Sequence, residues 1–292
     1  MSILVNRNTR VVAQGITGTF GRYHTARMLE YGTRIVAGVT PGRGGSTVNG
    51  VPVYDTVAEA VRHGGADAAI TFVPGPYTAQ AIAEDLEAGI PLVAAVVEGV
   101  PVRDMMLLMP LIRDCGATVI GPNSPGLLST DGCSIGFLPG SIYMPGPVGL
   151  VSRSGTFSYA VAHALTLAGL GQTTCVGIGG DPITGVGFVD MLERFEADPQ
   201  TEAIVLVGEI GRSCEEEAAE YIAAHVSKPV VAIIAGRTAP EGKAMGHAGA
   251  IISGGRGSYA SKEQALQGAG VPVARTPEEV ALRVGEALGR KP

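Results

Sequence analysis

The chain has 292 residues, of which 46% are hydrophobic and 16% charged, and it contains 43 glycines. This composition excludes a disordered chain and is enough for two domains of ordinary size. The net charge of −6 and the lack of tryptophan argue against a nucleic-acid partner, because such binding uses basic stripes and stacking aromatics.

The cysteines and the N-terminus bear on the cellular compartment. The four cysteines show neither CxxC pairing nor metal-ligand spacing, so we expect free thiols, a reducing compartment and no metal site. The N-terminus lacks the apolar stretch of a signal peptide, and no window of about 18 apolar residues predicts a membrane span. We therefore expect a cytoplasmic protein with no membrane partner, or a mitochondrial matrix protein in a eukaryote.

Short apolar runs alternate with helical patterns in the first part of the chain. Runs without a polar face are typical of strands buried on both sides, so a parallel sheet of an α/β domain is expected over residues 1–121. The expected strands are residues 11–13, 34–39, 68–73, 91–97 and 117–120. The expected helices are residues 25–31, 77–88 and 103–115.

A segment rich in proline and glycine, residues 122–147, then interrupts this alternation. We interpret it as a connector that packs but forms little regular structure. A second alternating half follows over residues 148–292. Its expected strands are residues 148–151, 174–178, 203–207, 229–234 and 272–274. Its expected helices are residues 157–168, 188–197, 215–225, 261–269 and 277–288, the last with Thr276 as N-cap.

Small and polar residues follow the first four strands of the second half. Because parallel sheets bind ligands beyond the carboxyl ends of their strands, these loops predict a functional edge. They are Ser152–Thr156, Gly179–Pro182, Gly208–Gly211 and Ala235–Arg237. Within the first loop, Ser154, Gly155 and Thr156 lead into a helix whose free N–H groups suit an anion, and a simple N-cap is an equal interpretation.

Gly15, Gly18 and Gly21 follow the first strand in a GxxGxxG pattern. Such glycines let the backbone approach a phosphate, although tight packing of strand against helix also explains them. Arg43, in the glycine-rich loop after the second strand, could clamp a phosphate through two hydrogen bonds. No P-loop motif occurs in the chain.

His247 lies among small residues in a predicted loop, where a bulky anion could approach either ring nitrogen. Glu209 ends an apolar strand, where a carboxylate is costly to bury unless it is paired. A carboxylate partner would fix the tautomer and orientation of the histidine, so the two residues form a candidate catalytic pair. The alternatives are a histidine in a flexible loop and an exposed carboxylate. The acidic run 215–217 is most simply the solvated first turn of a helix.

With these motifs the chain resembles the alpha-subunit family of NDP-forming succinate–CoA ligases, the succinyl-CoA synthetases. The resemblance covers nearly the whole length, and its most specific stretches are Met245–Ile252 and Ser152–Thr156. It implies a Rossmann-like CoA-binding domain, followed by a flavodoxin-like parallel-sheet ligase domain at 148–292. It also implies that His247 is the phosphorylated histidine and that Glu209 is the carboxylate supporting it.

The same resemblance implies further site residues and partners. Ser154, Gly155 and Thr156 would bind phosphate, and Tyr159 would belong to the organic-acid site. A separate ATP-grasp beta subunit would hold ATP or GTP with Mg²⁺, in an αβ or α₂β₂ assembly. The implied CoA-binding positions are Thr17, Gly18, Thr19, Phe20, Arg43, Val96, Val97 and Glu98.

The reaction implied is formation of an acyl-CoA from a dicarboxylic acid. A phosphoryl group would pass from the nucleotide to His247 and then to the carboxylate, and the CoA thiolate would displace phosphate. Succinate is the principal expectation for the acid. Malate and citrate are alternatives with the same chemistry, and a CoA-binding protein without catalysis is a third. Departures from residues common in the family occur at Phe20, Ser124, Arg212, Cys214 and Ala244.

Overall fold

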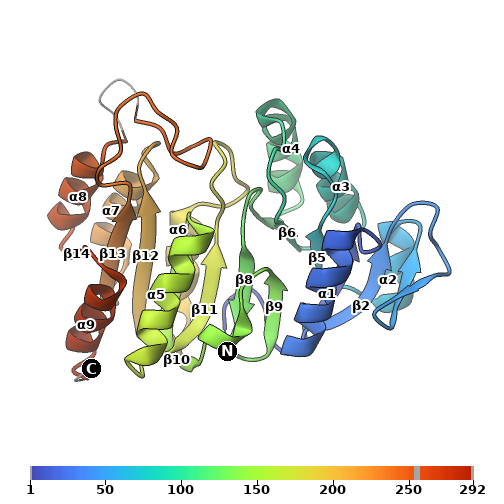
Figure 1. The fold of residues 1–292 in the computed structure, drawn as a ribbon, viewed down its shortest axis with the longest axis horizontal. Helices are drawn as coiled ribbons and strands as arrows, with labels where there is room; N and C mark the ends of the chain where they lie inside the picture. Colours follow the sequence, from blue (N-terminus) through green and yellow to red (C-terminus); the bar gives the residue numbers. More distant parts are fainter. Residues whose placement is uncertain (1, 253–256, 291–292) are drawn as a thin grey trace.

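The computed structural model describes residues 2–252 and 257–290, and it contains two α/β halves, each built on a seven-stranded sheet (Figure 1). The first sheet has the order β3-β4-β2-β1-β5-β6-β7, and its strands are parallel except for the hairpin of β3 with β4. Its strands are β1 (Arg10–Gln14), β2 (Arg34–Val39), β3 (Thr47–Val48), β4 (Val51–Tyr54), β5 (Ala68–Thr71), β6 (Leu92–Ala95) and β7 (Thr118–Ile120).

Both faces of the first sheet are buried, as its apolar strands predict. In β1, Val12 packs with residues of α2, α3 and α4, whereas Val11 and Ala13 face a core cluster on the opposite side. The sequence did not predict β3, β4 or α2, and α1 begins earlier than expected. The helices are α1 (Thr19–Tyr31), α2 (Val57–Gly64), α3 (Gly75–Glu87) and α4 (Val102–Asp114).

The second sheet has the order β14-β13-β12-β10-β11-β8-β9. Strands β10 to β14 are parallel to one another, whereas β8 pairs antiparallel with both β11 and β9. Its strands are β8 (Gly126–Ser129), β9 (Cys133–Gly136), β10 (Pro145–Ser152), β11 (Gln172–Gly177), β12 (Ala203–Glu209), β13 (Val230–Ala235) and β14 (Val273–Ala274).

The helices of the second half lie close to their predicted positions. Thr276 caps α9 as expected, because its side chain accepts a hydrogen bond from the N–H of Glu279 at 3.2 Å. The helices are α5 (Gly155–Leu167), α6 (Phe188–Ala197), α7 (Cys214–His225), α8 (Tyr259–Gly268) and α9 (Pro277–Ala287), with a 3₁₀ turn η1 (Gly140–Ile142).

The expectation that residues 122–147 form little regular structure is wrong. This segment contains the β8–β9 hairpin, which extends the second sheet by pairing with β11, and it also begins β10. Each hairpin strand has only four residues, all of them buried, which is too short a run for a strand pattern to stand out among the surrounding glycines and prolines.

The hairpin also joins the two halves, and Figure 1 shows β8 and β9 next to α1. The hydroxyl of Thr33 donates to the carbonyl of Ser134 at 2.8 Å and accepts from its N–H at 2.9 Å. The hydroxyl of Tyr31 donates to the carbonyl of Ser129. One core cluster runs from Val11 through Leu127 to Ile204, so the halves share buried apolar surface.

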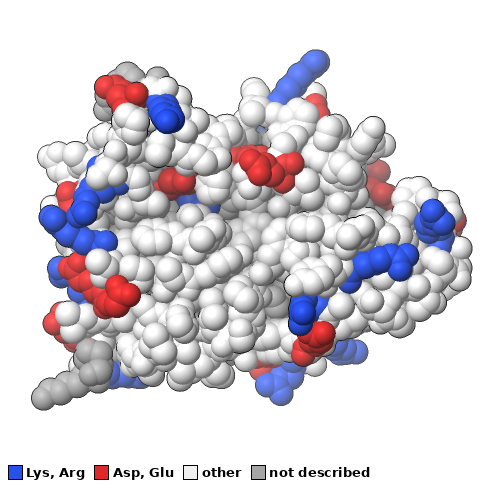
Figure 2. All heavy atoms as spheres, in the orientation of Figure 1, with Lys and Arg blue, Asp and Glu red and all other residues white. Residues whose placement is uncertain are grey.

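The face of the molecule drawn in Figure 2 carries charges of both signs. Figure 2 shows Lys and Arg as separate groups interspersed with Asp and Glu around a largely uncharged centre. In residues 2–252 and 257–290, no helix is long and apolar enough to cross a membrane.

Candidate functional site

His247 and Glu209 lie in contact at the carboxyl edge of the second sheet. Glu209 is the last residue of β12, and His247 lies in the segment between β13 and α8. Nδ1 of His247 is 2.8 Å from Oε2 of Glu209, and the two side chains are 24% and 8% exposed. The carboxylate is therefore nearly buried, whereas part of the imidazole faces solvent.

This contact determines the chemistry of the ring. The Glu209 hydrogen bond raises the pKa of His247 above its ordinary value, and the opposing effect of burial is smaller. In the neutral imidazole, Nδ1 carries the single proton and donates a hydrogen bond to the Glu209 carboxylate. Nε2 then keeps its lone pair, so this nitrogen can act as a nucleophile.

Glycines shape the space around the imidazole. A Cβ atom at Gly180, in the loop after β11, would lie 2.3 Å from Cγ of His247, so no side chain fits at this position. The N–H of Gly249 donates to the carbonyl of Gly180 at 3.2 Å. The absence of a side chain at Gly180 thus allows the histidine ring to pack directly on the loop after β11.

Hydrogen bonds connect this histidine segment to the first half. The N–H of Asn123 donates to the carbonyl of Val97, and the N–H of Gly180 donates to the carbonyl of Asn123. The Asn123 side chain also donates to Asp181 at 3.0 Å, and burial raises the pKa of Asp181. Glu98 is close enough to contribute to the raised pKa of His247. Residues after β6, β7, β11 and β12 therefore converge on one region.

Ser154, Gly155 and Thr156 form the start of α5, as predicted. The Ser154 hydroxyl accepts a hydrogen bond from the N–H of Phe157 at 3.4 Å, so it is an N-cap. The preceding residue, Arg153, is fully buried, and its Nη1 donates to the carbonyls of Glu209 and Gly211. Its Nε and Nη2 have no hydrogen-bond partner among the described residues. An anion at the start of α5 would be next to a helix N-terminus.

Glu215 corrects the prediction of a solvated acidic run. Its side chain has no exposed surface, and it forms ion pairs with Arg153 at 3.3 Å and with the equally buried Lys262. Of the acidic run, only Glu217 is exposed. Sequence spacing carries no signal for this contact, because the two cations lie far from Glu215 along the chain.

The predicted CoA-binding residues do not all lie in one cavity. A pocket of about 740 Å³ at the edge of the first sheet is lined by Thr17 and Gly18, with Thr40, Pro41 and Tyr77 among the others. The remaining candidates lie outside this lining. Thr19 and Phe20 begin α1, Arg43 is exposed, Val96 is buried, and Val97 and Glu98 follow β6.

Phe20 and Tyr159 do not line the pocket of Thr17 and Gly18. The Phe20 ring is 52% exposed and contacts His24 and Phe137. Tyr159 packs against the core of the second half, where burial raises its pKa.

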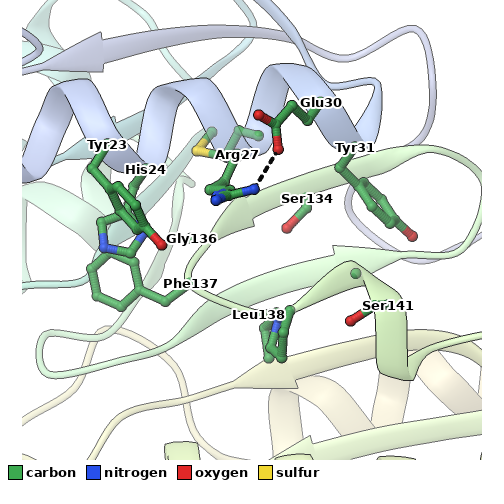
Figure 3. A pocket seen from close by; sticks show the side chains of 13 residues that line it. Tyr23, His24, Arg27, Glu30, Tyr31, Ser134, Gly136, Phe137, Leu138 and Ser141 are labelled. Carbon is green, nitrogen blue, oxygen red and sulfur yellow. Dashed lines mark hydrogen bonds and ion pairs between the residues drawn. The ribbon is translucent and has the colours of Figure 1, made fainter.

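A second pocket, of about 460 Å³, lies between α1 and the β9–η1 segment, and Figure 3 shows Arg27 and Glu30 paired at its edge. None of the predicted site residues lines this second pocket.

Models of two known families match successive parts of the chain. Residues 6–99 match the model of the CoA binding domain, and residues 151–272 match the model of the CoA-ligase family. The fold is that of an α/β CoA ligase, with the CoA-binding domain first.

Full-length relatives identify the particular family. The chain is 55% identical to "Succinate--CoA ligase [ADP-forming] subunit alpha 2" of Archaeoglobus fulgidus, over 99% of this chain and 100% of the relative. It is 52% identical to the alpha subunit of the same-named ligase of Aquifex aeolicus, over 99% of this chain and 95% of the relative. The chain belongs to the family of ADP-forming succinate–CoA ligase alpha subunits. CoA is a substrate of this family of enzymes, and the subunit name implies a beta-subunit partner.

Solved structures show the same architecture. The chain superposes on ATP citrate lyase from Methanothrix soehngenii, determined with citrate and coenzyme A, with a TM-score of 0.87 and 25% identity. The match covers 98% of this chain and 50% of that longer chain. A dinucleotide-forming acetyl-coenzyme A synthetase from Ca. Korarchaeum cryptofilum matches in fold, with a TM-score of 0.74 over 94% of this chain and 59% of that one.

Proposed function

We propose that this chain, with its beta subunit, forms succinyl-CoA from succinate and CoA through a phosphohistidine at His247. The observation that carries the proposal is the contact between Nδ1 of His247 and Glu209, which leaves Nε2 free. Full-length relatives named as succinate–CoA ligases favour succinate over malate or citrate.

The first step is phosphoryl transfer to the histidine. Nε2 attacks the γ-phosphorus of ATP, the bond from that phosphorus to the bridging oxygen breaks, and ADP leaves. We place ATP and Mg²⁺ on an ATP-grasp beta subunit, and GTP is the alternative nucleotide. Glu209 holds the Nδ1 proton and stabilises the positive charge that develops on the ring.

The next steps release the phosphoryl group and form the thioester. A carboxylate oxygen of succinate attacks the phosphorus, the P–N bond breaks, and succinyl phosphate forms. The CoA thiolate then attacks the acyl carbon and expels inorganic phosphate. The N-terminus of α5, with Ser154, Gly155 and Thr156, supplies positive potential for the phosphoryl oxygens.

We assign the CoA nucleotide to the pocket that Thr17 and Gly18 line, with Arg43 at its margin. The geometry of the pocket and the match to a CoA binding domain support this assignment. We further propose that Val96, Val97 and Glu98 lie along the path from this pocket to His247. This path is supported by main-chain hydrogen bonds that link Val97 to Asn123, Asn123 to Gly180, and Gly180 to Gly249.

The test uses the chain purified with its native beta subunit. The complex is incubated with γ-labelled ATP and Mg²⁺, and the label is mapped by peptide analysis. We expect an acid-labile label on His247 that succinate and CoA together discharge. His247→Asn should take no label, whereas His225→Asn, a change at the end of α7, should label normally. Faster discharge by malate or citrate would change the assigned acid, and a wild-type complex that takes no label would contradict the proposal.

A further inference from the structure

A cluster of charged side chains lies buried behind the residues that carry Glu209. Arg153, Glu215 and Lys262 have no exposed side-chain surface, and we call them the buried ionic cluster. Arg153 follows β10, Glu215 lies in the first turn of α7, and Lys262 lies in α8. Because desolvating charges is costly, buried ion pairs contribute little net stability, and the cluster calls for another explanation.

The side chains of the buried ionic cluster form hydrogen bonds to the main chain of residues 209–212. Nη1 of Arg153 donates to the carbonyls of Glu209 and Gly211, each at 3.1 Å. Oε1 of Glu215 accepts the N–H of Glu209 at 2.9 Å. Nζ of Lys262 donates to the carbonyl of Arg212 at 2.9 Å. Glu209 is thus fixed at both its N–H and its carbonyl by side chains of the cluster.

Glu215 is the carboxylate that the two cations share. Its Oε1 is 3.3 Å from Nη1 of Arg153, and its Oε2 accepts from Nζ of Lys262. Glu216, which is partly buried, pairs with Lys262 as well, at 2.9 Å. Arg153 has no second carboxylate within ion-pair distance among the described residues. Loss of the Glu215 charge would therefore leave Arg153 buried without a counter-ion.

The turn after Glu209 needs this support because its backbone is strained. Gly211 has a φ of +86°, and Arg212 has a φ of +55°, in a region that non-glycine residues seldom adopt. The bonds from Arg153 and Lys262 to the carbonyls of Gly211 and Arg212 hold this turn in place.

We propose that Glu215 is a positioning residue for the phosphorylation of His247, acting by holding the Glu209 main chain so that its carboxylate stays bonded to Nδ1. Glu215 does not touch the imidazole, and its effect passes through Glu209. This inference rests on the proposed function and names a residue on which the same site depends.

The role gives a signature in pH dependence. The charged groups that influence His247 are Glu209, Arg153, Glu98 and Asp181, and Glu209 is the one bonded to the ring. If the Glu209 carboxylate moves away, the pKa of His247 falls towards its ordinary value. The acid limb of the labelling rate, where Nε2 loses its proton, then moves to lower pH, while the limiting rate falls because the ring is no longer oriented.

The experiment measures the rate of His247 labelling by γ-labelled ATP across the acid limb, in the complex with the beta subunit. We expect Glu215→Gln to lower the limiting rate about tenfold or more, since small displacements of a reacting group cost that much. Its acid limb should move to lower pH, as in Glu209→Gln. Glu217→Gln, the same change at an exposed position of the same helix turn, should leave rate and limb unchanged.

A second variant covers the case in which Glu215→Gln does not fold. Arg153→Lys keeps the buried charge but loses the planar guanidinium, and it should shift the limb in the same direction by a smaller amount. A folded Glu215→Gln variant with a wild-type limb and rate overturns the inference. Where that variant does not fold, a folded Arg153→Lys variant with a wild-type limb and rate overturns it. If the wild-type complex takes no label, the proposed function itself fails. If the wild type is labelled and both variants match it, only the positioning role of Glu215 fails.

Discussion

At the scale of single residues, the bond between His247 and Glu209 links the state of the site to pH. The carboxylate stabilises the protonated imidazole, which is why the pKa of His247 is raised in the folded chain. The interaction of the protonated ring with Glu209 therefore stabilises the folded chain fully at pH values below the pKa of this histidine in the unfolded chain, about 6.5. This contribution disappears as the pH rises through the pKa of His247 in the folded chain.

Replacement of the carboxylate should reverse this shift. In Glu209→Gln, the pKa of His247 should fall towards or below its ordinary value, because the neutral amide no longer offsets the partial burial of the ring. The free energy of unfolding should decrease relative to wild type at acidic pH and converge with it at alkaline pH. A histidine NMR titration and denaturant unfolding at two pH values measure both effects. An unchanged titration midpoint would contradict the assignment of Glu209 as the cause.

The same pair shows what residue patterns can and cannot predict. The small residues around His247 and the carboxylate at the end of an apolar run indicate the pair from the sequence alone. Glu215 carries no such signal. Three consecutive glutamates resemble an exposed helix start, and only the fold brings Arg153 and Lys262 to the first of them. The roles assigned to the CoA-binding positions and to Tyr159 stay predictions.

At the scale of elements, the β8–β9 hairpin depends on two glycines that oppose each other. Gly126 has a φ of +90°, and a Cβ atom there would lie 1.9 Å from the carbonyl oxygen of Ile135. Gly136 has a φ of +141°, and its Cβ would meet the carbonyl oxygen of Pro125 at 2.2 Å. The strands can approach closely only because neither position has a side chain.

Gly126→Ala should therefore destabilise the chain by about 2 kcal/mol or more, from backbone strain and the clash with Ile135 together. Gly89→Ala is the matched control, since Gly89 has a φ of +81° and nothing within 4 Å of its Cβ position. The control isolates the cost of the backbone conformation. Denaturant unfolding of both variants measures the difference, and equal losses would show that the close approach is not limiting.

The hairpin also explains where element prediction failed. Glycine and proline are the strongest local signals for loops, and in residues 122–147 they outweigh strands of four residues. The pairing of β8 with β11 joins segments more than forty residues apart, so local sequence does not indicate it. The longer apolar strands, β10 and β12 among them, have no competing signal and were predicted.

At the scale of the whole molecule, the two halves share one continuous core. The cluster that contains Val11 and Ile70 of the first sheet also contains Leu127, Val151 and Ile204 of the second. The division into residues 1–121, 122–147 and 148–292 stays a proposal about sequence organisation. The shared core indicates that the halves depend on each other for stability.

We expect the isolated chain to unfold in a single cooperative transition, although chains of this length often show intermediates. Added CoA should move the whole transition to higher temperature, because ligand binding stabilises every part of a cooperative unit. Differential scanning calorimetry with and without CoA is the measurement. Two separable transitions, with only one of them shifted by CoA, would show that the core does not couple the halves.

The hairpin that spans both halves has a consequence for how this protein could be recombined during evolution. A gene fragment ending near residue 121 would encode a first half without the strands that cover α1, and the remaining fragment would expose Leu127 and Ile135. We therefore expect neither fragment to fold as stably as the whole chain. The superposition on ATP citrate lyase extends over both halves, since it covers 98% of this chain and 50% of that longer chain.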